Sequence, residues 1–164
     1  MAVMKHTILA VDDEPANLRM LERLFHREYR VLTASSGEEG LALLKGEEVS
    51  LIISDQRMPG MTGTEMLKES IRTNPDAVKI ILTGYTDVEA LIDAINCARV
   101  YRYVNKPWDP EKLKETVRAA INEREGLLGQ KRLIEGLVSL VQSHPWAFIS
   151  SESISNEQMV GEEV

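Results

Sequence analysis

Two stretches decide the fold: HTILAVDD, residues 6–13, and VSLIISD, residues 49–55. Each is an apolar run of strand length that ends in carboxylates, Asp12 and Asp13 in the first and Asp55 in the second. Core stability does not explain acids in these places, because burying an unpaired carboxylate is costly. If the two strands lie side by side in a parallel sheet, the three carboxylates meet at one edge, where open α/β folds build their sites.

The rest of the chain repeats this pattern. Apolar runs alternate with segments of helical period, which indicates βαβ units and a parallel sheet. We therefore predict an α/β fold, a doubly wound (βα)5 unit with a five-stranded parallel sheet, followed by an extended C-terminal helix and a polar tail. The expected strands are Thr7–Val11, Tyr29–Ala34, Leu51–Ser54, Val78–Thr83 and Tyr101–Asn105.

Capping residues mark where the helices between these strands begin. Proline is well placed in a first helical turn, and serine, threonine and aspartate are favoured caps. We expect the fourth helix to turn Ile92 inward. The five predicted starts are Glu14-Pro15, Ser35 or Ser36, Thr62 or Thr64, Thr86 with Glu89 as a capping box, and Asp109-Pro110.

The fifth helix shows no stop signal near residue 122. Apolar residues recur every seven positions, which predicts a coiled-coil seam and a homodimer. The alternative is a helix that ends near Arg124 followed by a separate short one, because Arg124 and Lys131 occupy companion core positions and three glycines weaken the helix. The seam consists of Leu113, Ala120, Leu127, Ile134 and Val141.

These patterns divide the chain into three parts. Residues 1–124 form the α/β domain, 125–142 a helical extension, and 143–164 a polar tail that we expect to be disordered. The length of 164 residues suits one domain and an appendage, and the 43% apolar and 27% charged fractions are normal for globular proteins. The single cysteine, Cys97, excludes an intramolecular disulfide.

Charge and hydropathy limit the kinds of partner that we expect this protein to bind. A net charge of -7 argues against a bare nucleic-acid binder, which usually carries a basic patch. The N-terminus lacks the apolar core of a signal peptide, and no run approaches the roughly 20 apolar residues of a membrane span. We therefore expect a cytoplasmic protein with no direct nucleic-acid or membrane partner.

The strand ends suggest phosphoryl chemistry. Three converging carboxylates repel one another unless a cation joins them, and oxygen-only ligands favour Mg²⁺. Two further strands end in Thr83 and Lys106, a hydroxyl and an ammonium suited to a bound phosphoryl group. From these residues alone, each carboxylate beside the metal could be ligand, base or nucleophile.

The chain resembles the receiver domain of bacterial two-component response regulators, the CheY-like family, over about residues 5–124. The resemblance rests on four stretches together: VDDEP (11–15), SDQRMPGMTG (54–63), ILTGYTD (81–87) and YVNKPW (103–108). It implies that Asp55 accepts a phosphoryl group from a histidine kinase or phosphotransfer protein. Such a protein catalyses no reaction beyond its own phosphorylation and dephosphorylation.

The resemblance also implies roles for the neighbouring residues. Asp13 would bind Mg²⁺ directly and Asp12 largely through water, with the backbone carbonyl of Arg57 as another ligand. Lys106 would contact the phosphoryl oxygens, and its peptide bond to Pro107 would be cis, which costs a proline little.

The same resemblance implies a conformational switch. The Thr83 hydroxyl would bond to the phosphoryl group, and Tyr103 would rotate into the space that Thr83 leaves, although Tyr103 could instead be a packed strand residue. Gly84 would leave access to Asp55 open. Arg57 and Tyr85 would tune the lifetime of the acyl phosphate.

Alternative functions follow from the same features. A Mg²⁺ phosphohydrolase would place an Asp-x-Asp pair after the first strand, whereas Asp12 and Asp13 are adjacent. A flavin binder of the same topology needs neutral phosphate-binding loops. A phosphorylation-independent scaffold usually lacks the acids, the threonine or the lysine that are present here.

The resemblance leaves the effector open. The output is either a partner that binds around the fourth and fifth helices and fifth strand, or a dimer that signals to an effector outside this chain.

Overall fold

The computed structural model describes residues 6–84, 92, 96 and 98–144. Its sheet contains β1 (Thr7–Val11), β2 (Arg30–Ala34), β3 (Leu51–Asp55), β4 (Val78–Thr83) and β5 (Arg102–Asn105). Its helices are α1 (Pro15–Phe25), α2 (Gly37–Leu44), α3 (Gly63–Ser70) and α5 (Pro110–Ser143).

All strand pairs are parallel, and the strand order is β2-β1-β3-β4-β5. This confirms the predicted doubly wound sheet. The chain passes from β1 to β2 on one side and reaches β3 on the other, so the order reverses between β1 and β3. Their carboxyl ends are in register, with Val11 beside Ser54, and ligand sites in open α/β sheets form at such a reversal.

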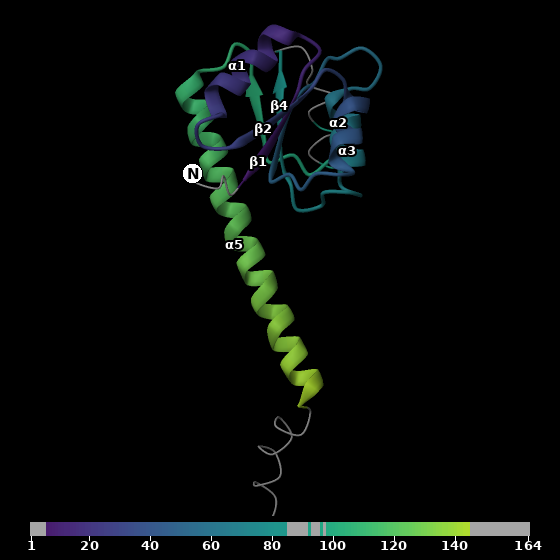
Figure 1. Cartoon of the computed structure of the whole chain (residues 1–164), viewed down its shortest axis with the longest axis vertical. Coiled ribbons are helices and arrows are strands. Elements are labelled where there is room, and N and C mark those ends of the chain that lie inside the picture. Colours follow the sequence, from purple (N-terminus) through teal and green to yellow (C-terminus); the bar gives the residue numbers. More distant parts are fainter. Residues whose placement is uncertain (1–5, 85–91, 93–95, 97, 145–164) are drawn as a thin grey trace, which may run out of the picture. The chain divides into compact units, whose positions relative to one another are not determined.

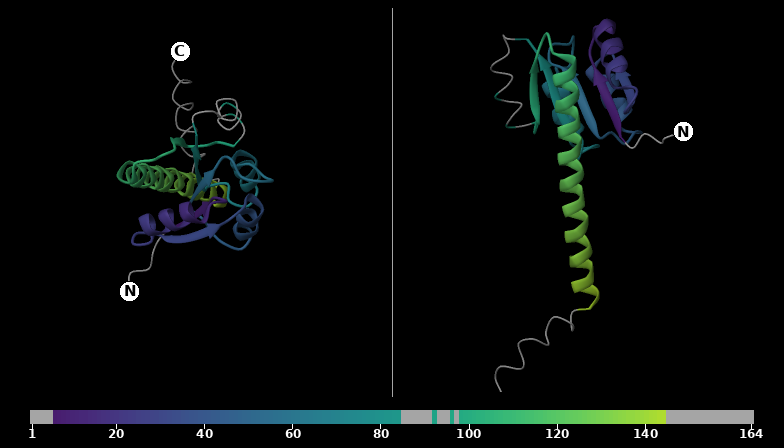
Figure 2. Two further views of the ribbon diagram at one scale, coloured as in Figure 1. Left: turned by 90° about the horizontal axis from the view of Figure 1, so that it is seen from above. Right: turned by 90° about the vertical axis from the view of Figure 1, so that its left-hand side faces the viewer.

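Helices cover both faces of the sheet, with α1 and α5 on one face and α2 and α3 on the other (Figures 1 and 2). Strand residues alternate between the faces: Ile8, Leu51 and Ile80 pack towards α1 and α5, while Leu9 and Ile52 pack towards α2 and α3. These side chains are essentially inaccessible to solvent. Two buried layers therefore hold the sheet and fix its carboxyl edge.

The helix starts follow the predicted capping signals. Glu14 precedes Pro15 at the first position of α1, and the Ser36 hydroxyl accepts a hydrogen bond from the Glu39 amide at α2. Thr62, rather than Thr64, caps α3.

Most of the predicted fourth helix lies outside the described residues. The inward orientation expected for Ile92 is wrong, since this side chain is 58% exposed.

Three strand boundaries differ from the prediction by one residue. Tyr29 precedes β2 because its amide still donates to the Phe25 carbonyl at the end of α1, and its ring packs 6.1 Å from that of Phe25. Tyr101 likewise precedes β5, whereas β3 extends to Asp55, which pairs with Leu82.

Helix α5 is continuous from Pro110 to Ser143, so the alternative of two separate helices is wrong. By the density of internal contacts the chain forms two units, one through Arg124 and one from Glu125. Residues 145–164, most of the predicted tail, lie outside the described part. Among the described residues, no helix is long and apolar enough to cross a membrane.

Candidate functional site

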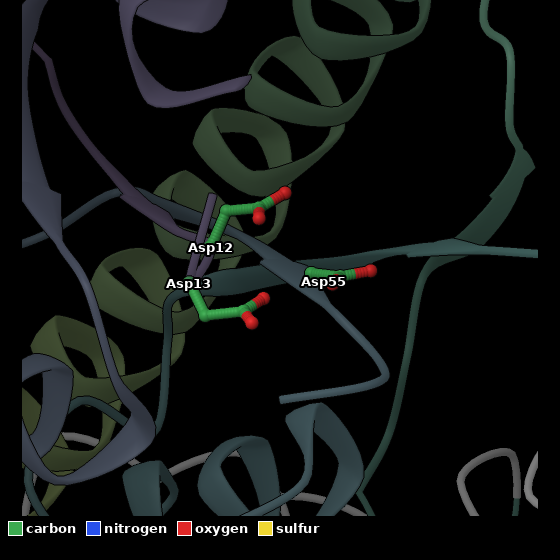
Figure 3. A group of neighbouring side chains, drawn as sticks. All are labelled: Asp12, Asp13 and Asp55. Atoms are coloured by element: carbon green, nitrogen blue, oxygen red, sulfur yellow. The ribbon is translucent and has the colours of Figure 1, made fainter. Parts of the chain in front are cut away.

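Three carboxylates meet at the carboxyl edge of the sheet. Asp12 and Asp13 follow β1 and Asp55 ends β3, and one oxygen from each lies within 4.8 Å of the others (Figure 3). Asp12 and Asp55 are buried, at 1% and 7% exposure, while Asp13 is exposed. The structure thus brings together the acids that the two deciding stretches predicted.

Asp12 is held by groups from the start of α1. Its Oδ1 accepts from the Glu14 amide at 2.9 Å, and its Oδ2 accepts from Asn17 Nδ2 at 3.0 Å. Sequence reasoning missed Asn17; the available signal was an amide side chain in the first turn after the acids. Among the described residues, the Asp13 carboxylate has no hydrogen-bond or ion-pair partner, so it is the acid open to a ligand.

Lys106 supplies the positive charge at this edge. Its Nζ lies 2.9 Å from Asp55 Oδ1 and 3.6 Å from Asp12 Oδ2. The backbone positions this side chain, because the Lys106 amide donates to the Thr83 carbonyl at 2.9 Å. The peptide bond from Lys106 to Pro107 is cis.

Burial raises the pKa of Asp55, and the nearby charge of Asp12 adds to this, although the ion pair with Lys106 acts in the opposite direction. Burial alone would lower the pKa of Lys106, but its contacts with Asp55 and Asp12 outweigh burial and raise that pKa. Lys106 therefore stays protonated at neutral pH, while the ionised form of Asp55 is penalised by its surroundings.

The other predicted residues lie around this cluster. Thr83 is buried at the end of β4, and its hydroxyl donates to the Gly84 carbonyl at 3.1 Å. Tyr103 on β5 is half-buried against the α2 and α3 face, where burial raises its pKa. Gly84 and Arg57 are exposed. Tyr85 lies outside the described residues.

The donor set fits a hard divalent cation. Three carboxylates face one ammonium, so the edge has an excess of negative charge, and all three candidate ligands offer oxygen. Carboxylate oxygens suit Mg²⁺, which binds few protein groups and keeps several waters. The acidic triad is thus consistent with the metal site of receiver domains.

Solved structures share this architecture. A receiver domain described as CheY-like, from Methanospirillum hungatei, superposes with a TM-score of 0.70 at 33% identity, covering 74% of this chain and 97% of that one. An adenylate cyclase structure from Rhodopirellula baltica gives a TM-score of 0.75 at 34% identity, covering 79% and 97%. Fold and acidic edge together define a CheY-like domain.

The sequence profile of the response regulator receiver domain matches residues 8–118. This chain belongs to the response regulator receiver family. The hydrogenase transcriptional regulatory protein HoxA of Cupriavidus necator is 46% identical over 129 residues, 79% of this chain and 27% of that protein. Escherichia coli GlrR, a transcriptional regulatory protein, is 30% identical over 96% of this chain and 38% of its own length. The chain thus spans about a quarter to two fifths of these relatives.

Proposed function

We propose that Asp55 accepts a phosphoryl group from a histidine kinase or phosphotransfer protein, in the presence of Mg²⁺, and that phosphorylation switches the domain. The observation that carries this proposal is the Asp55 carboxylate paired at 2.9 Å with Lys106 inside an acidic triad of the receiver family.

In the proposed transfer, an Asp55 carboxylate oxygen attacks the phosphorus of a phosphohistidine. A P–O bond forms as the P–N bond breaks, the electron pair stays on the imidazole nitrogen, and that nitrogen takes up a proton. Lys106 Nζ remains beside the new acyl phosphate and stabilises its oxygens. Asp13, Asp55 and the Arg57 carbonyl would hold Mg²⁺, with Asp12 acting largely through water; the ion supplies charge neutralisation.

A pocket beside Lys106 suits the phosphodonor protein. Its volume is about 470 Å³, and it is lined by Glu14, Asn17, Met20, Lys106, Pro107 and Trp108. Met20 on α1 is 49% exposed there. A donor that reaches Asp55 from the α1 side must cover this pocket, so Met20→Lys should slow transfer from a histidine kinase and leave labelling by acetyl phosphate unchanged. Equal slowing with both donors would contradict this docking site.

The proposed phosphorylation is tested by incubation with acetyl phosphate and Mg²⁺ followed by intact mass measurement. One phosphoryl group should be added to the wild type and none to Asp55→Asn. In Asp13→Ala, labelling by acetyl phosphate should no longer increase when Mg²⁺ is added, because the substitution removes the open metal ligand. Full labelling of Asp55→Asn would refute Asp55 as the acceptor.

The proposed switch starts at Thr83. Its hydroxyl already lies at the carboxyl edge, and its carbonyl already accepts from the Lys106 amide at 2.9 Å. A hydrogen bond from Thr83 to the phosphoryl group would draw the end of β4 towards Asp55, and half-buried Tyr103 would move into the space left. Gly84, Arg57 and Tyr85 are proposed to set access to the acyl phosphate and its lifetime.

The output is proposed to belong to an effector that this domain controls. The similar proteins include transcriptional regulators and an adenylate cyclase structure, so the receiver is what they share. A separate partner bound around β5 and α5 remains the alternative output.

A second candidate role, dimerisation, is favoured by an apolar face on the extension. Its members share high exposure, 45–66%, and on a helix of 3.6 residues per turn they lie within an arc of roughly 160°. This face is wider than the predicted seam, which included neither Leu133 nor Leu140. It consists of Leu127, Leu133, Ile134, Leu137, Val138, Leu140 and Val141.

Arg124 does not belong to this face. Its Nε donates to the Asp76 carbonyl at 2.8 Å, within the receiver unit. Arg124, which the sequence placed at a companion core position, instead holds the last receiver turn of α5 through this bond. Leu113 and Ala120 of the predicted seam are buried in the receiver core, so the exposed part of the seam begins at Leu127.

We propose that a second copy of the chain covers this face, in parallel register. Leu127, Ile134 and Val141 repeat every seven residues, a spacing that an identical helix matches, and Gln130 between them can fix the register by pairing with its symmetry mate. Light scattering should detect a concentration-dependent dimer, tightened by beryllofluoride and lost on Leu127→Asp/Ile134→Asp. Glu115→Asp, on the exposed receiver part of α5, is the control. A monomer at high micromolar concentration in both states would favour the separate-partner output.

A further inference from the structure

The loop between β3 and α3 is closed at its base by Gln56. This loop contains Arg57, whose carbonyl is the proposed metal ligand, and it returns to Gly63 at the first turn of α3. The Gly63 amide donates to the Gln56 carbonyl at 3.0 Å. The two ends of the loop therefore meet beside Asp55.

The Gln56 side chain makes a second closure. Its Oε1 accepts from the Thr64 amide at 3.1 Å and from the Thr64 hydroxyl at 2.7 Å. Gln56 is only 7% exposed and Thr64 is partly buried, so these bonds are partly protected from competing water. One residue thus binds α3 through both its main-chain and side-chain oxygens.

The same residue also orients the phosphoacceptor. The Gln56 amide donates to Asp55 Oδ1 at 2.9 Å and to the Leu82 carbonyl of β4 at 3.1 Å. Gln56 is therefore fixed on three sides: by Asp55, by β4 and by the start of α3. Any freedom of its backbone would change where the next carbonyl, that of Arg57, lies relative to the Asp55 carboxylate.

We propose that Gln56 is a positioning residue, whose side-chain contact with Thr64 holds the Arg57 carbonyl and the Asp55 carboxylate in the arrangement that Mg²⁺ binding requires. This inference rests on the proposed phosphoacceptor function. Residues that orient metal ligands through hydrogen bonds commonly change metal affinity by about 10- to 100-fold when they are replaced.

Thr64 provides a test that leaves the proposed ligands and their neighbours untouched. Thr64→Val removes the hydroxyl donor but keeps the amide, whereas Thr64→Ser keeps both. Gln56→Leu removes the acceptor at similar volume. If Gln56 acts through the loop, Mg²⁺ affinity should fall about tenfold in Gln56→Leu, by a smaller factor in Thr64→Val, and not at all in Thr64→Ser.

The assay is Mg²⁺ titration of the folded protein, monitored by Trp108 fluorescence. Hydrogen exchange of the Arg57, Met58, Gly60 and Met61 amides is measured in addition, without metal. Exchange should quicken in Gln56→Leu and Thr64→Val. Ser70→Ala is the structural control, because it removes a buried bond within α3, Ser70 Oγ to the Leu67 carbonyl at 2.6 Å, and should leave both readouts unchanged.

Two outcomes are distinct. Wild-type Mg²⁺ affinity in Gln56→Leu would overturn the positioning role while leaving the proposed function intact. A wild-type protein that binds no Mg²⁺ would overturn the proposed function itself.

Discussion

Replacing Asp13 by asparagine should stabilise the metal-free protein and abolish its stabilisation by Mg²⁺. Asp13 lies within 4.8 Å of two other carboxylates, and the ion pairs of Lys106 in the described part of the chain are with those two, Asp55 and Asp12. Among the described residues no cation forms an ion pair with Asp13 itself, so its charge adds net repulsion to the cluster. An asparagine of the same shape removes that repulsion and replaces the charged metal ligand with a neutral amide oxygen, which attracts Mg²⁺ far less.

The magnitude follows from Coulomb's law. Two unit charges 4.8 Å apart repel by ~0.9 kcal/mol in water and ~3.5 kcal/mol at an effective dielectric constant of 20. Because Asp13 is exposed, the value in water applies to its repulsion from each of the two other acids, Asp12 and Asp55. The positive charge of Lys106 cancels part of this repulsion. Asp13→Asn should therefore gain about 1 kcal/mol, or about 3–5 °C in Tm for a domain of this size.

Mg²⁺ should make the wild type more stable than Asp13→Asn, which reverses their order in the absence of metal. A ligand at ten times its Kd stabilises a protein by about 1.4 kcal/mol, so the wild type should rise in Tm by more than the variant's initial advantage. Asp13→Asn should hardly respond. The two curves of Tm against Mg²⁺ concentration should cross.

Thermal unfolding in EDTA and in rising Mg²⁺, at fixed ionic strength, measures both effects. Glu115→Gln is the matched control, since it makes the same change of charge on the exposed surface of α5 and should leave both baseline and Mg²⁺ response as in the wild type. Added monovalent salt should shrink the EDTA difference by screening. The reasoning is wrong if Asp13→Asn is less stable than the wild type in EDTA, or if both gain equally from Mg²⁺.

Three further predictions concern the same edge. The raised pKa of Asp55 means that its contribution to stability is present below the ordinary aspartate pKa of about 3.9 and is lost as pH rises through the higher folded pKa. Metal-free Asp55→Asn should accordingly be more stable than the wild type at pH 7, with the difference vanishing towards pH 4 in urea titrations; a pH-independent difference would contradict this. Gly63→Ala should cost about 1–3 kcal/mol in the same urea assay, because a Cβ there would overlap the Asp55 carbonyl oxygen, and wild-type stability would show that the loop can relax. Thr83→Ala should be labelled by acetyl phosphate as the wild type is, yet beryllofluoride should no longer tighten its dimer in light scattering; a wild-type response would remove Thr83 from the switch.

The sequence alone determined the sheet and the identity of its acidic edge. Apolar runs and capping residues are local signals, and they predicted all five strands to within one residue at each boundary and the starts of α1, α2, α3 and α5. Parallel strands bring their carboxyl ends to one edge whatever the distance along the chain. The strand ends were therefore enough to predict that Asp12, Asp13 and Asp55 share an edge, and the structure confirms the assumption that β1 and β3 are neighbours.

The partners that hold these residues depend on how the folded chain packs, which its local patterns do not record. Arg124 donates to the carbonyl of Asp76, 48 positions away, and no local pattern distinguishes that contact from a place in a coiled-coil seam. The contacts of Asn17 with Asp12 and of Gln56 with Thr64 likewise depend on how a helix start and a loop approach the sheet edge. Hydropathy and spacing indicate which side chains are buried and on which face of a helix or of the sheet they lie. The donor that reaches a given acceptor is set by distances of a few tenths of an ångström, and these arise only when the whole sheet, its loops and its helices pack together.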